Sequence, residues 1–223
     1  FGPLLSGLDG PALYGTNELH RSLQERVDFA RLNAGDCRYT ATAVDLETGE
    51  DVAFDSAAQR IEADHIRASA ALPVLFSPVE VEGRWFVDGG ISANLALDPF
   101  FAAPPSRPTL CIAVDLLPMA QALPRTASDA ASRMQDLVFA TQTRRSLTRW
   151  SEAYAAHRDP GIVFAKLTYA AQKDEIVGKA LDFSAGTIEA RWRKGRSQAE
   201  KLLQEMQNGE IRFAETGLQI YDR

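Results

Sequence analysis

Two neighbouring stretches decide the fold: ASAALPVLFSPV at residues 68–79 and RWFVDGGISAN at residues 84–94. They predict a short helix, a loop broken by proline, a hairpin, and a carboxylate at the end of a strand. Gly89 and Gly90 let the backbone turn sharply after Asp88, and we expect one of them to adopt a conformation unfavourable to other residues. The carboxylate should therefore point out of the sheet edge, where catalytic groups tend to lie. Because Asp-Gly is also a good turn by itself, Asp88 is either a candidate catalytic residue or a turn residue.

Outward from this centre, strand and helix patterns alternate, which predicts the α/β class. The turn signals at 47–50 and at Glu82-Gly83 should each close a hairpin. We expect helices at 16–33, 62–71, 125–157 and 184–206, strands at 37–46, 51–55, 108–116 and 162–169, a hairpin at 79–87, and a weak strand at 211–221.

Apolar stripes on the two long helices predict how these helices pack. In the 125–157 helix, Met134, Leu137, Val138 and Thr141 form one stripe, which then slips in phase to Leu147, Trp150 and Tyr154. In the 184–206 helix, apolar and small residues recur at heptad spacing, which predicts packing on the 125–157 helix or on a second subunit. The members of this heptad stripe are Ile188, Trp192, Gly195, Ala199, Leu202 and Met206.

Composition narrows the function classes. Against 24 Lys and Arg stand 30 Asp and Glu, giving a net charge of −6, which argues against nucleic-acid binding and against docking on anionic lipid by charge alone. No run approaches 18 apolar residues, so no transmembrane helix is expected. Cys37 and Cys111 lie in apolar strand patterns and are expected to be buried, which excludes a disulfide framework, a zinc site and a cysteine nucleophile. Since the sequence starts at Phe1 without methionine or a signal peptide, we expect a fragment or a processed product.

The quoted stretches resemble the patatin-like phospholipase family, in which an Asp-Gly-Gly or Asp-Gly-Ala triplet follows a region like 76–79. The resemblance covers roughly residues 16–117, and the tail, with Asp182-Phe183-Ser184, is similar to the C-terminal extension of a bacterial subgroup. It implies a three-layer α/β/α sheet, of which residues 1–117 supply the C-terminal half of the catalytic domain. Residues 118–223 would then be a helical C-terminal extension packed on it.

The resemblance also implies a reaction: hydrolysis of lipid acyl esters by a serine–aspartate dyad without histidine. Asp88 would be the catalytic base, with Gly89, Gly90 and Asn94 supporting its turn. This chemistry needs no metal or organic cofactor. The implied substrate is a lipid or another acyl ester and the implied location is cytoplasmic; peripheral membrane contact and homo-oligomer formation are left open.

The sequence departs from the family pattern at the nucleophile. The family places its serine on a Gly-x-Ser-x-Gly elbow between a strand and a helix. Of the 13 serines only Ser92 and Ser197 have glycine two residues earlier, and neither has the second glycine. The only Gly-Gly pair follows Asp88, so no upstream oxyanion loop is present. We therefore expect the nucleophile and its oxyanion loop in an N-terminal portion outside these residues, and no esterase activity from this chain alone.

Several alternatives stay open at this point. The chain could be a non-catalytic binding module of the same fold, or part of a thioesterase or carboxylesterase that acts on soluble esters. His65 could face a pocket and complete a Ser-His-Asp triad, whereas His20 and His157 are expected at the surface.

Two further residue sets have competing interpretations. Asp45 and Asp115 are expected to cap turns at strand ends, although Asp115 could line a cleft. Phe100 and Phe101 are expected in the core, because an exposed aromatic pair is costly without a partner. The competing interpretation makes this pair an apolar lip for lipid.

Overall fold

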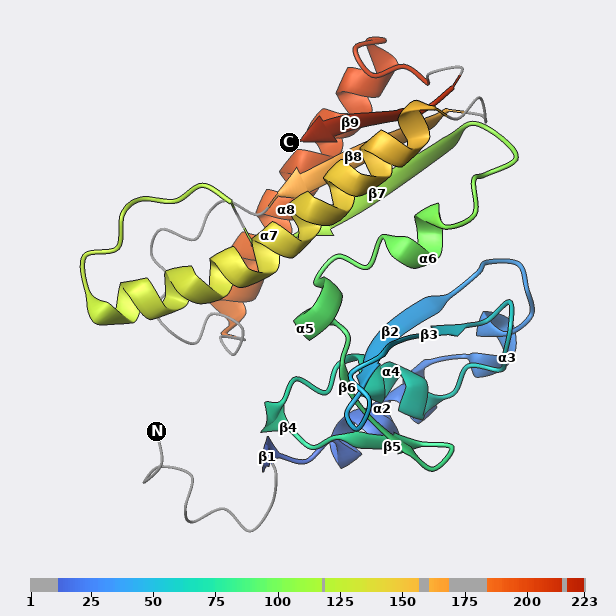
Figure 1. Ribbon diagram of the computed structural model, residues 1–223, viewed down its shortest axis with the longest axis vertical. Coiled ribbons are helices and arrows are strands. Elements are labelled where there is room, and N and C mark those ends of the chain that lie inside the picture. Colours follow the sequence, from blue (N-terminus) through green and yellow to red (C-terminus); the bar gives the residue numbers. More distant parts are fainter. Residues whose placement is uncertain (1–11, 118, 157–160, 169–183, 214–215, 223) are drawn as a thin grey trace. The chain divides into compact units, whose positions relative to one another are not determined.

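The computed structural model describes residues 12–117, 119–156, 161–168, 184–213 and 216–222 (Figure 1). The chain forms two compact units, which meet in the sequence between Pro99 and Phe100. Both units combine strands with helices, so the predicted mixed α/β class is confirmed. The division at 117/118, with an extension packed on the first part, stays a prediction.

The first unit is built on a four-stranded antiparallel sheet in the order β3-β2-β6-β5. Both predicted hairpins are present. In the tight one, Glu82 and Gly83 have φ of 52° and 77°, as a turn that matches the twist of the strands requires. The strands are β2 (Thr40–Asp45), β3 (Asp51–Asp55), β5 (Val79–Val81) and β6 (Arg84–Asp88), and β1 (Ala12–Tyr14) pairs in parallel with β4 (Val74–Phe76) in a separate two-stranded sheet.

Helix α4 (Ala63–Ser69) is the predicted alanine-rich helix, and it packs on β2, β5 and β6. Its buried Ala68 joins a core that includes Phe54, Ile61 and Phe86. The first predicted helix is split into α2 (Asn17–Arg26) and α3 (Phe29–Leu32), because Val27 is extended and the Asp28 side chain accepts a hydrogen bond from Arg31 N to begin the second helix. Two further short helices are α5 (Gly90–Ala93) and α6 (Asp98–Phe101), and α6 crosses the boundary between the two units in the sequence.

The second unit contains a parallel sheet in the order β7-β8-β9, with β7 at Thr109–Asp115, β8 at Ile162–Thr168 and β9 at Leu218–Asp222. Helix α7 (Ala127–Ala155) covers one face and α8 (Ala185–Gln207) covers the other (Figure 1). The central strand β8 alternates accordingly. Val163 packs in a cluster with Leu202 of α8, whereas Phe164 packs against Phe101, which stacks on Trp150 of α7. This unit is thus a three-layer α/β/α arrangement.

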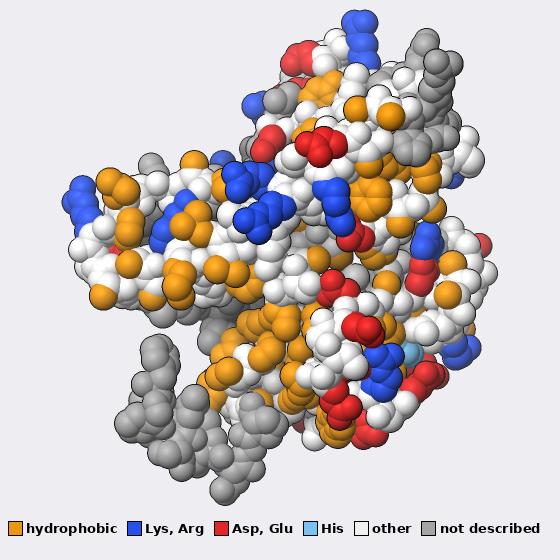
Figure 2. Space-filling model, viewed as in Figure 1, with side chains coloured by type: hydrophobic (Ala, Val, Ile, Leu, Met, Phe, Trp, Pro, Cys, Tyr) orange, Lys and Arg blue, Asp and Glu red, His pale blue; other side chains and the backbone are white. Residues whose placement is uncertain are grey.

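Both predicted stripes are buried only in their C-terminal parts, and in α7 this part contains the buried Leu147 and Tyr154. In α7, Met134 is 65% exposed and Val138 is also exposed, and Figure 2 shows hydrophobic side chains over this half of the helix. In α8, only the C-terminal part of the heptad stripe is buried, through Leu202, whereas Trp192 is 75% exposed. The predicted packing of Trp192 on α7 is therefore wrong, and its packing on a second subunit stays a prediction. The buried residues of α7 are Asp136, Ala140, Thr143, Leu147 and Tyr154.

Smaller differences concern single side chains. Phe101 is 1% exposed and lies in the core as expected, but Phe100 is partly exposed. Cys37 is exposed, so its predicted burial is wrong. Cys111 is partly buried, and burial raises the pKa of its thiol to about 11. In the residues that the structure describes, no helix combines the length and the apolar character needed to cross a membrane.

Candidate functional site

Asp88 is the last residue of β6, where the chain leaves the sheet of the first unit. It pairs in register with Ala43 of β2, and its backbone N–H donates to the carbonyl of Ala71 at 3.0 Å. Helix α5 begins two residues later, at Gly90. The predicted place of Asp88 at a strand end is confirmed, and the strand on one side and the short helix on the other fix the start and the end of its turn.

The Asp88 carboxylate is held on one side and open on the other. The backbone N–H of Gly90 donates to Oδ1 at 2.7 Å. Across the described residues this is the single hydrogen bond to the carboxylate, so Oδ2 can accept another. Burial raises the pKa of Asp88 above its ordinary value, and the Gly90 N–H opposes this in part. A partly desolvated carboxylate is a stronger base than one in water.

Residues 89 and 90 are glycine because a side chain at either position would come too close to neighbouring atoms, and not because the backbone adopts an unusual conformation. Gly89 has φ −62° and ψ −21°, and Gly90 also lacks a positive φ, so the expected conformation unfavourable to other residues is wrong. A methyl group on Gly89 would instead lie 2.6 Å from both the carbonyl and the hydroxyl oxygen of Thr42 in β2. On Gly90 it would lie 3.0 Å from Asp88 Oδ1. Glycine lets the turn pass this close to the sheet.

Asn94, the third predicted support residue, is exposed at the C-terminal end of α5. Its side-chain oxygen lies 3.7 Å from the position that a Gly90 methyl would take, so it is close to the turn. Its supporting role stays a prediction.

Neither serine with an upstream glycine lies on a nucleophile elbow. Ser92 is exposed within α5, and its hydroxyl donates to Asp51 Oδ2 at 2.9 Å. Ser197 is exposed in the middle of α8, with helix on both sides. An elbow requires the serine at a sharp turn from strand into helix, and these two serines lack that setting.

The two described histidines, His20 and His65, have structural partners. His65 is buried, accepts a hydrogen bond on Nδ1 from Glu62 N at 2.9 Å, and packs edge-on against Phe54. It therefore caps α4. His157 lies outside the described residues, as do Asp182 and Phe183.

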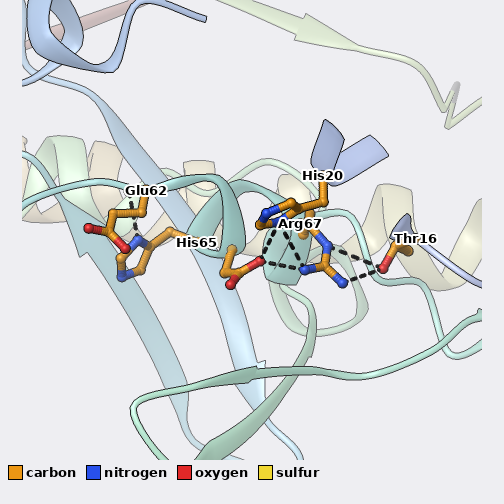
Figure 3. A network of polar contacts seen from close by, with 6 residues as sticks. Thr16, His20, Glu62, His65 and Arg67 are labelled. Atoms are coloured by element: carbon orange, nitrogen blue, oxygen red, sulfur yellow. Dashed lines mark hydrogen bonds and ion pairs between the residues drawn. The ribbon is translucent and has the colours of Figure 1, made fainter. Parts of the chain in front are cut away.

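His20 belongs to a polar network between α2 and α4, which the sequence interpretation missed (Figure 3). His20 Nδ1 lies 2.9 Å from Asp64 Oδ1, and Arg67 binds both Asp64 and the Thr16 hydroxyl. Thr16 thus accepts from a guanidinium instead of capping α2. Sequence patterns could not reveal this network, because Arg67 and Thr16 are 51 residues apart in the chain.

The other two candidate carboxylates are buried. Asp45 accepts from the backbone N–H of Glu47 and Thr48, each at 2.9 Å, and pairs with Arg84; these bonds lower its pKa. Asp115 accepts from Leu117 N at 3.1 Å and lies 3.8 Å from Lys166 Nζ. Both hold turns, as predicted. The described ranges contain no group of three or more His, Cys, Asp or Glu residues arranged to hold a metal ion.

Two family models match the sequence of this chain. A model described as patatin-like phospholipase matches residues 8–101, and a second, described as patatin phospholipase, matches residues 120–211. The chain therefore belongs to the patatin-like phospholipase family. Uncharacterised NTE family proteins of Mycobacterium bovis and of two Mycobacterium tuberculosis strains are each 48% identical over 67 residues. That stretch covers 30% of this chain and 16% of each relative.

Proposed function

We propose that this chain carries the catalytic aspartate of a lipid acyl hydrolase, and that the complete protein supplies the nucleophilic serine from outside these 223 residues. One observation carries the proposal: the Asp88 carboxylate stands at a strand end, held by Gly90 N–H through Oδ1 and without a bonded partner at Oδ2 among the described residues. A base for a serine hydroxyl needs a free oxygen at a fixed position.

The proposed reaction uses Asp88 twice. The serine hydroxyl passes its proton to the Asp88 carboxylate while its oxygen bonds to the acyl carbon of the ester. The protonated Asp88 then gives this proton to the departing alcohol oxygen as the acyl–oxygen bond breaks. A water molecule enters next. Asp88 takes one proton from this water while the water oxygen bonds to the acyl carbon. The bond between the acyl carbon and the serine oxygen then breaks, and the serine oxygen receives that proton from Asp88 to become a free hydroxyl.

The raised pKa of Asp88 suits this exchange. A base whose pKa lies closer to the working pH accepts a proton more readily and still returns it to the leaving group. Burial is the largest cause of this shift. The family membership supports an acyl ester as the substrate class.

Covalent labelling tests the split between base and nucleophile. A fluorophosphonate reacts with an activated serine, so the complete protein should be labelled at one serine outside residues 1–223, and the present chain should not be labelled or hydrolyse an aryl ester. Labelling of Ser92 or Ser197 in this chain would contradict the proposal, and Ser92→Ala is the control for the exposed hydroxyl next to Asp51.

One observation favours a second candidate, a non-catalytic binding module: the 223 residues contain no Gly-x-Ser-x-Gly sequence. A complete protein that also lacks this elbow and resists the fluorophosphonate would support the module. If labelling succeeds, a panel of phospholipids, thioesters and short aryl esters distinguishes a phospholipase from a thioesterase or carboxylesterase. Vesicle co-sedimentation and light scattering test the proposed peripheral membrane contact and homo-oligomer.

A further inference from the structure

The second unit contains a cavity of about 460 Å³ that is independent of Asp88, a residue of the first unit. Its volume lies within the range of small-molecule sites. Residues of α7, β8 and β9 line it, together with Met119 from the segment before α7. Every described lining residue belongs to the second unit.

The cavity lies between α7 and the strands β8 and β9. Lys166, which lines it, is two residues from the end of β8 and pairs in register with Asp222 at the end of β9. From α7, Arg144, Leu147 and Ser151 lie three or four residues apart and therefore share one face of the helix.

Two cationic residues, Lys166 and Arg144, line the cavity, and they differ in whether a carboxylate neutralises their charge. Lys166 is buried, with its Nζ 3.0 Å from Asp222 Oδ2 and 3.8 Å from Asp115 Oδ2, so its charge is already neutralised. Arg144, at the exposed rim, has no ion pair or side-chain hydrogen bond within the described ranges. Glu152 also lines the cavity, but it lies eight residues farther along α7, about 12 Å at the helical rise. Arg144 is thus the cation open to a ligand.

The remaining walls are mostly apolar and fit a chain rather than a small ion. Met119, Leu147 and Ile220 contribute hydrocarbon surface, and Ile220 is partly exposed. Inorganic phosphate would leave this surface in water, whereas an alkyl chain would cover it. A guanidinium at one end binds a carboxylate through two parallel hydrogen bonds.

We propose that this cavity binds a fatty carboxylate of medium chain length, with the carboxylate on Arg144 and the alkyl chain along Leu147 and Ile220. The site goes beyond the proposed hydrolase function, because binding here requires neither Asp88 nor a nucleophile. The proposed ligand of the second unit is a carboxylate, which is the chemical class that ester hydrolysis releases.

Isothermal titration of the 223-residue chain with decanoate tests the proposal. Arg144→Gln should weaken binding about 10- to 100-fold, as expected for the loss of a charge-assisted pair. Arg145→Gln is the matched control, because it removes the same charge from the next residue, which is exposed and does not line the cavity. Ile220→Ser should also weaken binding, and acetate should bind more weakly than decanoate because it lacks the chain.

Three results would overturn the proposal. The first is no heat of binding from decanoate at millimolar concentration in a folded chain. The second is an equal loss of affinity in Arg144→Gln and Arg145→Gln, which would mean attraction by net charge alone. The third is phosphate binding as tightly as decanoate, which would indicate an anion site without a place for the alkyl chain. Circular dichroism of each variant confirms that it remains folded.

Discussion

Gly89→Ala should destabilise the first unit more than any other single methyl addition near Asp88. The new Cβ would lie 2.6 Å from the Thr42 carbonyl oxygen, 2.6 Å from its hydroxyl oxygen and 2.7 Å from its carbonyl carbon. Real Cβ atoms essentially never approach other heavy atoms this closely, so something must move. The hydroxyl can rotate away, but the carbonyl belongs to the backbone of β2.

The magnitude follows from how firmly that backbone is held. Thr42 pairs with Ala53 of β3, and the next residue, Ala43, pairs with both Val52 and Asp88. Moving Thr42 therefore disturbs β2 together with its neighbours on both sides. Overpacking a well-filled site typically costs about 1–3 kcal/mol, and we expect the upper end, about 3 kcal/mol. For a chain of this size that corresponds to a loss of about 6–12 °C in melting temperature.

Urea denaturation of the chain measures this free energy of unfolding, with two glycine variants as controls. Gly90→Ala should cost about 1 kcal/mol or less, because its methyl meets a side-chain oxygen 3.0 Å away that can shift. Gly195→Ala, in α8 with open space around it, should stabilise by about 0.5–1 kcal/mol. A Gly89→Ala variant as stable as Gly90→Ala would refute the close approach of the turn to β2.

The other predictions concern a buried hydroxyl and the pH dependence of two carboxylates. The Thr143 hydroxyl is buried without a hydrogen-bond partner among the described residues, so Thr143→Val should leave stability unchanged or raise it by about 1 kcal/mol, and a clear loss on thermal melting would contradict this. Because the pKa of Asp45 is lowered from its ordinary value of 3.8, its ionised form stabilises the fold, and this stability is lost as pH falls through the lower folded pKa. Asp45→Asn should therefore melt below wild type at pH 7, and the difference should shrink below pH 3.8. A difference that stays constant with pH would be inconsistent with the pairing of Asp45 and Arg84. The raised pKa of Asp88 has the opposite sign: Asp88→Asn should be at least as stable as wild type at pH 7 and lose that advantage in acid, and a strongly destabilised variant would point to a structural role.

Local signals in the sequence were enough to predict most elements. The β5–β6 turn follows from Glu82-Gly83, where both residues adopt positive φ, and the start of α4 follows from residues within one turn of each other. Asp88 at a strand end is equally local, since the apolar strand before it and the two glycines after it are adjacent in the chain. These features depend on neighbours in sequence, and so they could be found without a structure.

The wrong predictions concern contacts between distant residues. Which face of α7 is buried depends on the sheet beneath it, and the stripe that meets the sheet contains Asp136 and Thr143 rather than Met134. The need for glycine at 89 depends on Thr42, which is 47 positions earlier and reaches it only when β2 pairs with β6. Hydrophobic periodicity identified Leu147 and Tyr154 on the buried face of α7, but it could not identify the polar members of that face or the contact at Gly89.

The most direct test of the central claim measures ester hydrolysis by the complete protein with Asp88 intact and with Asp88→Asn. Asparagine keeps the shape and the acceptor for Gly90 N–H but cannot take a proton from serine. We predict that kcat/KM for an aryl ester falls about 10²- to 10⁴-fold, the usual contribution of a general base, while the melting temperature at pH 7 does not fall. Turnover within a few-fold of wild type in a folded Asp88→Asn protein would show that Asp88 is a turn residue and not the base.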